Sequence, residues 1–323
     1  MADLRAVVTG ATGLVGFHVS SELLKQGYRV MALGRNADIL EELEGLGAEA
    51  FHLDIRADLK EWPTFDQGAV WVHCAAAVSG ASSDILWDVN VEGTRKVIET
   101  AIEEKGKRFI HTSSIATYDM EIGRAFREGD PLRPGSEYGR TKLEADRLVT
   151  SMLKGVIPYT IFKPPFIIGP RDRNFTYEVY RRLENGKLPL LTRDGRIGLI
   201  DARDLAETYV QAVEIKDMFD QTYNIQSFAV SFHEFVQTLC RISGLEPPKR
   251  KTPYPLAYIA AIGVEFVNKL RGRNSERGLS RYRIKTLTQD RILDTEKLRT
   301  VMEFHPRPWT RSLEDWFSEF SGK

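Results

Sequence analysis

The sequence predicts an α/β protein built on a Rossmann-type, doubly wound parallel sheet, with a smaller and mostly helical C-terminal part. In the first half of the 323 residues, short apolar runs alternate with amphipathic stretches of helix length. Such alternation is typical of parallel strands that are joined by crossover helices. Uninterrupted runs such as AVWVHCA favour strands that are covered on both faces. The glycine-rich stretch TGATGLVG follows the first apolar run directly, as expected at the start of a βαβ unit.

Each expected element of this first half has its own apolar run or helical period. Strands are expected at Arg5–Thr9, Arg29–Leu33, Glu49–Leu53, Val70–Cys74, Arg108–Thr112 and Tyr159–Lys163, and helices at Leu14–Gln26, Val89–Glu104 and Tyr138–Leu153. After Pro164 proline and arginine become frequent and helices dominate. One more strand is expected at Ile197–Ile200, returning to the first sheet before a helix from about Ala202. We therefore expect a Rossmann domain of residues 1–168 plus about 197–226, and a second domain of about 169–196 plus 227–323.

Composition argues against several functional classes. Lysine plus arginine (45) equal aspartate plus glutamate (45), so no overall field is available to attract nucleic acid. The 2 cysteines and 6 scattered histidines form no disulfide framework and no metal-ligand spacing, so no metal is expected. The apolar run Leu256–Val267 is too short to cross a bilayer, and we interpret it as a buried helix; a lipid-contacting face is the alternative. With no leader pattern at the N-terminus, we expect a cytoplasmic protein without membrane contact.

The stretch TGATGLVG has the features of a dinucleotide-binding turn. Gly10 would allow a tight turn, Gly13 a close approach of the backbone to a pyrophosphate, and Gly16 close packing of helix on strand. The amide groups at the start of the following helix would hold the phosphates. An ordinary glycine-rich turn is the alternative, and the position between strand and helix disfavours it. Cofactor contacts are expected from Gly10, Thr12, Gly13, Leu14, Val15 and Gly16.

The end of the second strand indicates which nicotinamide dinucleotide is preferred. An NAD site usually has a carboxylate there, whereas this sequence has Arg35 and no acid before Asp38. A guanidinium suits a 2′-phosphate, so we expect NADP(H) in preference to NAD(H); a solvated surface arginine is the alternative. Asp54, after the third strand, either meets the adenine amino group or caps its loop.

A tyrosine and a lysine mark the candidate catalytic centre. Tyr138 and Lys142 are four residues apart, on one face of a helix, where a cation can stabilise a phenolate. By itself this pair is common by chance. Ser113 and Ser114, however, follow the fifth strand, where either hydroxyl could polarise a carbonyl beside Tyr138; capping of a turn is the alternative role. We place Ser114 in the catalytic set.

In these motifs the chain resembles an extended short-chain dehydrogenase/reductase over nearly its whole length. The resemblance is carried by TGATGLVG, HLDI, HCAAAVS, DVNVEGT, HTSSIATY, REGDPLRPGSEYGRTKLEAD, KPPFIIGPRD and IDARDLAE. It implies that Tyr138 is the acid/base, that Lys142 is its partner, that Ser114 polarises the carbonyl, and that Asn90 kinks the central helix. It also implies cofactor contacts from Ile55, Ala75, Ala76 and Pro165, with Pro164 beside the carboxamide, and a homodimer through the helices Val89–Glu104 and Tyr138–Leu153. Lys163 departs from the family, in which arginine is common at that position.

Within this resemblance three enzymatic branches compete. The stretch Thr112–Ser114 lacks the acidic pair of the sugar-nucleotide dehydratases. The Arg-Asp pair of the epimerases is replaced by Ile197-Gly198, for which Arg196 could compensate. The C-terminal stretch is similar to 3β-hydroxysteroid dehydrogenases and dihydroflavonol 4-reductases, which implies alcohol–carbonyl oxidoreduction of a small or lipophilic substrate. A nucleotide-sugar 4-epimerase and a non-catalytic NADP-binding redox sensor are the alternatives.

The C-terminal part contains one strongly basic run. Residues 269–285 hold seven basic side chains and one acid. We interpret this run as a solvated loop; closure over an anionic substrate or contact with a membrane surface is the alternative.

Overall fold

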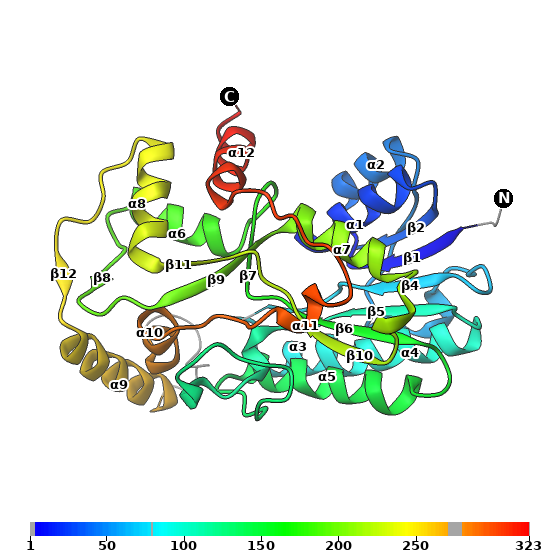
Figure 1. Ribbon diagram of the computed structural model, residues 1–323, viewed down its shortest axis with the longest axis horizontal. Coiled ribbons are helices and arrows are strands. Elements are labelled where there is room, and N and C mark those ends of the chain that lie inside the picture. The colour runs from blue at the N-terminus through cyan, green and yellow to red at the C-terminus, as the bar shows by residue number, and fades with distance from the viewer. Residues whose placement is uncertain (1–3, 79, 271–279, 323) are drawn as a thin grey trace.

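Seven parallel strands form the main sheet of the protein. The computed structural model describes residues 4–78, 80–270 and 280–322. The strands of the sheet lie in the order β3-β2-β1-β4-β5-β6-β10 (Figure 1). Their bounds are β1 (Arg5–Thr9), β2 (Arg29–Gly34), β3 (Glu49–His52), β4 (Val70–His73), β5 (Arg108–Thr112), β6 (Tyr159–Lys163) and β10 (Gln221–Asn224). The predicted doubly wound parallel sheet is confirmed. From β1 the chain adds β2 and β3 toward one edge of the sheet, and then returns to the other side of β1 and adds β4, β5 and β6 toward the opposite edge.

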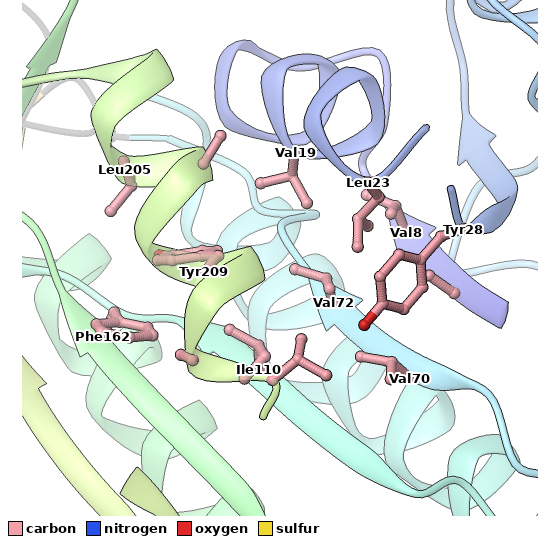
Figure 2. Packing of buried hydrophobic residues seen from close by; sticks show 14 of the residues in the cluster. Val8, Val19, Leu23, Tyr28, Val70, Val72, Ile110, Phe162, Leu205 and Tyr209 are labelled. Atoms are coloured by element: carbon pink, nitrogen blue, oxygen red, sulfur yellow. The ribbon is translucent and has the colours of Figure 1, made fainter. Parts of the chain in front are cut away.

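Helices cover both faces of this sheet, so every central strand is buried on both sides. On β1, Ala6 and Val8 point toward one face and Val7 toward the other, as the two-residue period of a strand requires. In Figure 2, helices α1 and α7 pack on the first face through Val19 and Tyr209. The helices that take part are α1 (Leu14–Lys25), α2 (Ala37–Gly45) and α7 (Ala202–Ala212) on this side, and α3 (Ser83–Trp87), α4 (Thr94–Glu103) and α5 (Glu137–Leu153) on the other.

The second part of the molecule contains two small sheets. The first consists of β7 (Phe166–Ile168), β9 (Arg196–Asp201) and β11 (Phe228–Ser231), and the second of β8 (Leu190–Leu191) and β12 (Lys251–Thr252). The strand expected at Ile197–Ile200 is therefore present as β9, but its expected return to the first sheet is wrong. It pairs with β7 and with β11, and the main sheet is instead extended by β10. The residues of a single strand carry no sequence signal for its pairing partner.

Helices make up most of this second part. They are α6 (Phe175–Glu184), α8 (Phe232–Ser243), α9 (Tyr254–Leu270), α10 (Arg281–Thr288) and α12 (Trp309–Ser321), whereas α11 (Glu296–Arg299) packs on the core of the main sheet through Leu298. A separate core holds α6, α8 and α12 against the small sheet, with Phe235 and Trp316 among its buried side chains. The expectation of a smaller, mostly helical C-terminal part is confirmed.

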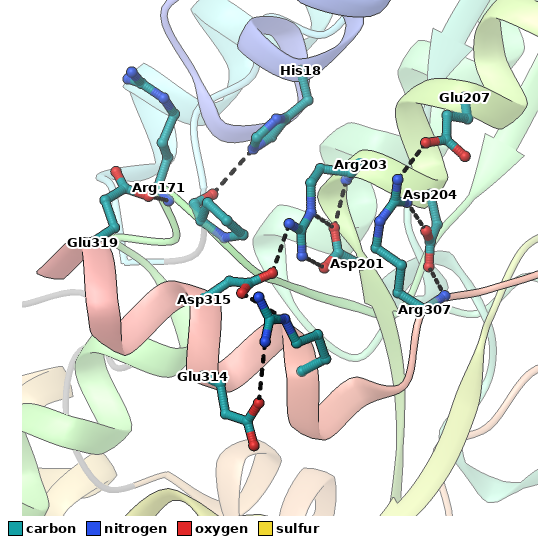
Figure 3. Close-up of polar contacts among 12 residues, drawn as sticks. His18, Arg171, Asp201, Arg203, Asp204, Glu207, Arg307, Glu314, Asp315 and Glu319 are labelled. Carbon is teal, nitrogen blue, oxygen red and sulfur yellow. Dashed lines mark hydrogen bonds and ion pairs between the residues drawn. The ribbon is translucent and has the colours of Figure 1, made fainter. Parts of the chain in front are cut away.

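Ion pairs attach the C-terminal end of the chain to α7 and β9. Asp201 caps α7 and binds the Arg203 guanidinium, which also donates to Asp315 of α12 at 2.8 Å (Figure 3). Arg307 donates to Asp204 and Glu207 of α7. These partly buried pairs connect the last helix to a helix that packs on the main sheet, and so they fix the second core relative to the first.

Helix α9 differs from its expected environment. The run Leu256–Val267 does form a helix, but Leu256, Ile259 and Phe266 are 61%, 65% and 63% exposed. Only the small residues Ala257 and Ala261 of this run are buried, against Leu191 and Ile284. The interpretation as a buried helix is therefore wrong.

Candidate active site

The glycine turn brings β1, α1 and the end of β4 into close contact. Gly10 has φ +69°, and a Cβ there would lie 2.6 Å from the Ala75 Cα atom. A Cβ on Gly16 would lie 2.2 Å from the Gly10 carbonyl oxygen, which agrees with the packing role expected of this glycine. A Cβ on Gly13 would lie 3.2 Å from the same oxygen, and Gly13 is exposed. The turn therefore leaves its exposed edge at Gly13 without side chains.

The beginning of α1 suits the phosphates of a dinucleotide. Gly13 is the N-cap of α1 and supplies no side-chain hydrogen bond, and the first turn of the helix contains no acid. The free amide groups and the positive end of the helix dipole are thus available to an anion beside Leu14 and Val15. Thr12 lies on the β2 side, where its hydroxyl accepts a hydrogen bond from the Arg35 amide at 3.3 Å. The residues present fit a dinucleotide pyrophosphate.

Two arginines and a carboxylate lie just after the ends of β2 and β3. The Arg35 side chain is 64% exposed, and its Nη1 atom is 3.6 Å from Asp54 Oδ2. Asp54 accepts hydrogen bonds from the backbone and the guanidinium of Arg56, which lower the pKa of its carboxyl to about 2. The bonds of Asp54 are those of a loop cap. Arg35 and Arg56 form a positive surface at the position expected for the adenosine ribose.

The serine pair after β5 is divided between two environments. The Ser113 hydroxyl is buried and donates to Asp146 Oδ2 at 2.8 Å. Ser114 instead lies beside Tyr138, the second residue of α5. Burial raises the pKa of the Tyr138 phenol to about 12, while the hydrogen bond with Ser114 lowers it. Ser114, rather than Ser113, is therefore the serine beside the candidate acid/base.

Lys142 lies one turn further along α5 and is almost fully buried. Within the described ranges, its Nζ atom makes no hydrogen bond to a protein group. Burial lowers the pKa of Lys142 to about 8, whereas the Asp146 carboxylate raises it. A buried ammonium without a protein acceptor suits an external hydroxyl, such as that of a ribose.

Asn90 connects three parts of the site. It lies in a π-helical turn, Asp88–Gly93, between α3 and α4. Its amide nitrogen donates to the Ala77 carbonyl at 3.0 Å and to the Thr141 hydroxyl at 2.9 Å, and its oxygen accepts from the Ala77 amide at 2.7 Å. Thr141 lies between Tyr138 and Lys142 on α5. Asn90 therefore fixes the loop after β4 and the catalytic face of α5 to an irregular helix, as the implied kink requires.

The remaining expected contact residues lie around the same strand ends. Ile55 is buried after β3, where a Cβ on Gly93 would meet it at 2.6 Å. Ala75 packs on the glycine turn, and Ala76 follows it in the loop that Asn90 holds. Pro164 accepts a hydrogen bond from the Ile115 amide at 2.9 Å, which ties the end of β6 to the residue after Ser114; Pro165 follows, buried.

Sequence reasoning missed a set of buried ionisable groups behind the catalytic face. Lys163 donates to Asp146 and, at 2.8 Å, to Thr117, while His111 Nε2 lies 3.5 Å from Asp146 Oδ1. We call His111, Asp146 and Lys163 the ion cluster. Although burial opposes ionisation, Lys163 and His111 hold the pKa of Asp146 well below its usual range. Two sequence features could have indicated the ion cluster: Asp146 follows Lys142 by one helical turn, and Lys163 departs from the family pattern.

Two further residues near the site come from the C-terminal part. Tyr282 of α10 lies close enough to Tyr138 to raise the pKa of its phenol further. Arg291 donates to the Tyr282 hydroxyl at 3.0 Å, is buried, and meets no carboxylate among residues 4–78, 80–270 and 280–322. Within the basic run 269–285, Ser280 is the N-cap of α10 and α10 begins at Arg281, while residues 271–279 lie outside the described residues.

Comparison with known proteins identifies the class. Residues 6–225 match the model of the NAD-dependent epimerase/dehydratase family, and the chain belongs to this family. It is 25% identical to sterol demethylase protein B of Methylococcus capsulatus over 98% of this chain and 99% of the relative. It is 23% identical to the decarboxylating sterol-4-alpha-carboxylate 3-dehydrogenase of Schizosaccharomyces pombe, over 94% and 93% of the two chains. The expected NAD(P)-dependent enzyme of the extended short-chain dehydrogenase/reductase type is thereby confirmed.

Solved structures share the fold. UDP-glucuronic acid 4-epimerase of Bacillus cereus, in complex with NAD and a fluorinated UDP-sugar, superimposes with a TM-score of 0.76 at 21% identity, over 99% of each chain. At this identity the similarity defines the fold alone.

Proposed function

We propose that this protein is an NADP(H)-dependent oxidoreductase that interconverts a secondary alcohol and a ketone or aldehyde of a small or lipophilic substrate. The observation that carries the proposal is the grouping of Ser114, Tyr138 and Lys142 at the edge of the sheet where β5 ends, which is the edge at which β1 enters the glycine turn. The relatives named as sterol enzymes support the lipophilic branch.

The roles of the side chains follow from their positions. In the reducing direction Tyr138 gives its proton to the substrate oxygen, and in the oxidising direction it takes the proton from the hydroxyl. Ser114 holds the same oxygen by a hydrogen bond and favours the charge that develops on it. Lys142 stabilises the Tyr138 phenolate and binds the ribose of the cofactor. The cofactor supplies or accepts the hydride at nicotinamide C4, while the protein positions and polarises the substrate.

A nucleotide-sugar 4-epimerase is the second candidate, because of Arg291. A buried guanidinium without a carboxylate partner in the described part of the chain suits an anionic substrate group. Arg196, which could have compensated for the missing epimerase pair, is held instead by Asp290 through its backbone amide and its guanidinium. Oxidoreduction therefore remains the first candidate.

Cofactor turnover separates these two functions. The protein is incubated with NADPH and a panel of ketones that includes sterols, or with UDP-sugars, and the absorbance of the reduced nicotinamide is followed. We expect stoichiometric loss of NADPH with a ketone. An epimerase returns its hydride in every cycle, so conversion of a UDP-sugar without net change of cofactor would reject the oxidoreductase proposal.

The preference for NADP(H) rests on Arg35. Asp54 is already satisfied by Arg56, so the exposed Arg35 guanidinium is available to a 2′-phosphate. In a fluorescence titration we expect NADPH to bind more tightly than NADH, and Arg35→Ala to weaken NADPH binding by roughly tenfold, or about 1.4 kcal/mol. Lys25→Ala, at the opposite end of α1, is the matched control. Equal binding of NADH and NADPH by the wild-type protein would overturn this preference.

Other expectations stay predictions. We propose that the part containing α10 and Arg291 forms the substrate pocket. The domain limits expected from the sequence stay a prediction, apart from β9, which pairs outside the main sheet. The homodimer and the cytoplasmic location also stay predictions.

A further inference from the structure

Helix α9 presents its apolar residues to solvent and its small or polar residues to the protein. We define the apolar face as Leu256, Ile259, Ile262, Val264, Phe266 and Val267, all of which are exposed. The opposite side of the helix packs through Ala257 and Ala261, with Tyr254 and Tyr258 partly buried. A helix that only packed against its own protein would have the reverse arrangement. A contiguous exposed apolar surface of this kind marks an interaction site.

The charges that border the N-terminal end of this face are mostly positive, and the exposed acid Glu246 lies 3.7 Å from Lys249. Exposed Lys249 and Arg250 directly precede the helix together with Lys251, and the Arg193 guanidinium lies 4.2 Å from the centre of the Tyr254 ring in the first turn. The acid of α9, Glu265, is not available as a negative group, because it binds Arg281 of α10 through its side chain at 2.7 Å. An apolar face bordered by basic groups is complementary to an anionic, partly apolar surface.

The position of α9 suits a surface contact of the whole protein. The helix lies at the outer edge of the second part, next to α10 and away from α1 and α2 (Figure 1). Within the described ranges, no helix is long and apolar enough to cross a membrane, so α9 would lie along a bilayer surface. Helix α10, on which α9 packs, carries Tyr282 near Tyr138. The face therefore adjoins the element that reaches the candidate active site.

We propose that the apolar face of α9 docks onto the surface of a phospholipid bilayer that contains anionic headgroups. Leu256, Ile259 and Phe266 enter the boundary between headgroups and acyl chains, while Arg193 and Arg250 contact the headgroup phosphates. Such docking is separate from catalysis and does not depend on the identity of the substrate.

Vesicle flotation of the full chain tests this proposal. The protein is mixed with vesicles of phosphatidylcholine alone, or of phosphatidylcholine with phosphatidylglycerol, at low and high salt. We expect binding to the anionic vesicles that weakens with salt. Ile259→Asn with Phe266→Asn should reduce the partition coefficient by roughly tenfold or more. Lys249→Gln with Arg250→Gln should remove the preference for anionic vesicles.

A matched variant controls for the loss of exposed apolar surface. Leu46→Asn with Val156→Asn changes two residues that are 52% and 58% exposed but lie outside α9, and it should bind vesicles like the wild type. The proposal is overturned if the wild type fails to bind, if it binds neutral vesicles equally well, or if the α9 variant binds unchanged. A dimer in sedimentation equilibrium that the α9 variant dissociates, without vesicle binding by the wild type, would assign the face to a second copy instead and would also overturn it.

Discussion

The ion cluster under α5 and the apolar face of α9 depart from the usual distribution of side chains in opposite directions. Behind the catalytic face, Asp146 and Lys163 are charged groups that the protein buries. On α9, Ile259 and Phe266 are large apolar groups that it exposes. Buried charges are tolerated only when they are paired and hydrogen-bonded, and exposed apolar patches persist where they serve an interaction.

The ion cluster and the apolar face of α9 differ in where their interaction partners lie. The main partners of the buried charges lie inside the chain, since Lys163 and Ser113 both donate to Asp146 Oδ2, while Oδ1 has His111 Nε2 at 3.5 Å and no hydrogen bond within the described residues. The apolar face of α9 has no such partner within the described residues. The chain therefore supplies the main partners of the buried ion cluster, whereas the exposed apolar face of α9 requires another surface.

Removal of one member of the ion cluster should have the largest effect. Asp146→Asn leaves Lys163 buried beside Lys142 without a carboxylate, so we expect a loss of about 3–5 kcal/mol in the free energy of unfolding. Urea unfolding measures it. Asp146→Leu combined with Lys163→Met removes both charges and should lose much less. Equal stability of Asp146→Asn and the wild type would show that the cluster carries no net electrostatic energy.

The burial of Lys142, which lowers the pKa of its ammonium, should appear as a pH dependence. Because the pKa of Lys142 is lowered to about 8, its ammonium is present below that pH and is lost as the pH rises through it. If the ribose accepts from the ammonium, NADPH affinity should be constant below pH 8 and fall above it, by up to about tenfold for each pH unit.

Titrations of NADPH fluorescence at several pH values on both sides of this pKa measure that dependence. Lys142→Met should bind more weakly and show a flat profile in this range. Lys154→Met, just after α5, should keep the wild-type profile. If the NADPH affinity of the wild-type protein did not change across the same pH range, the Lys142 ammonium would not contribute to cofactor binding.

The smallest effect is expected on α9. Because Ile259 is 65% exposed, Ile259→Ala should change the free energy of unfolding by no more than about 0.5 kcal/mol. Ile284→Ala, at the buried contact between α9 and α10, should cost about 2–5 kcal/mol. Both are measured by urea unfolding. A large cost for Ile259→Ala would show that this face is packed in solution and would remove the contrast.

Much of the fold was predictable because its signals are local. The six predicted strands of the first half follow from apolar runs of strand length, and β1, β5 and β6 have the predicted bounds. The pairing of β9 with β7 and β11 was not predictable, because the residues of one strand do not indicate its neighbour. The orientation of α9 was missed because an apolar run is usually buried, and the run itself does not say which side meets the protein.

The candidate site likewise contains residues that the sequence identifies and residues that only the fold brings together. TGATGLVG and the Tyr138–Lys142 pair are spaced within one turn or one helix, so sequence alone identifies them. Its ion cluster joins β5, α5 and the end of β6, and Tyr282 comes from α10. These residues come into contact only when the sheet and the second part assemble, and no local sequence pattern predicts their contact.

The central claim is that Tyr138 transfers the proton of an oxidoreduction, and Tyr138→Phe tests it most directly. The variant is compared with Tyr177→Phe, a control on α6, for NADPH binding and for turnover of the ketone found in the panel. We predict that kcat/KM falls by roughly a hundredfold to ten-thousandfold in Tyr138→Phe while NADPH binds as in the wild type. Turnover by Tyr138→Phe at the wild-type rate would contradict the account.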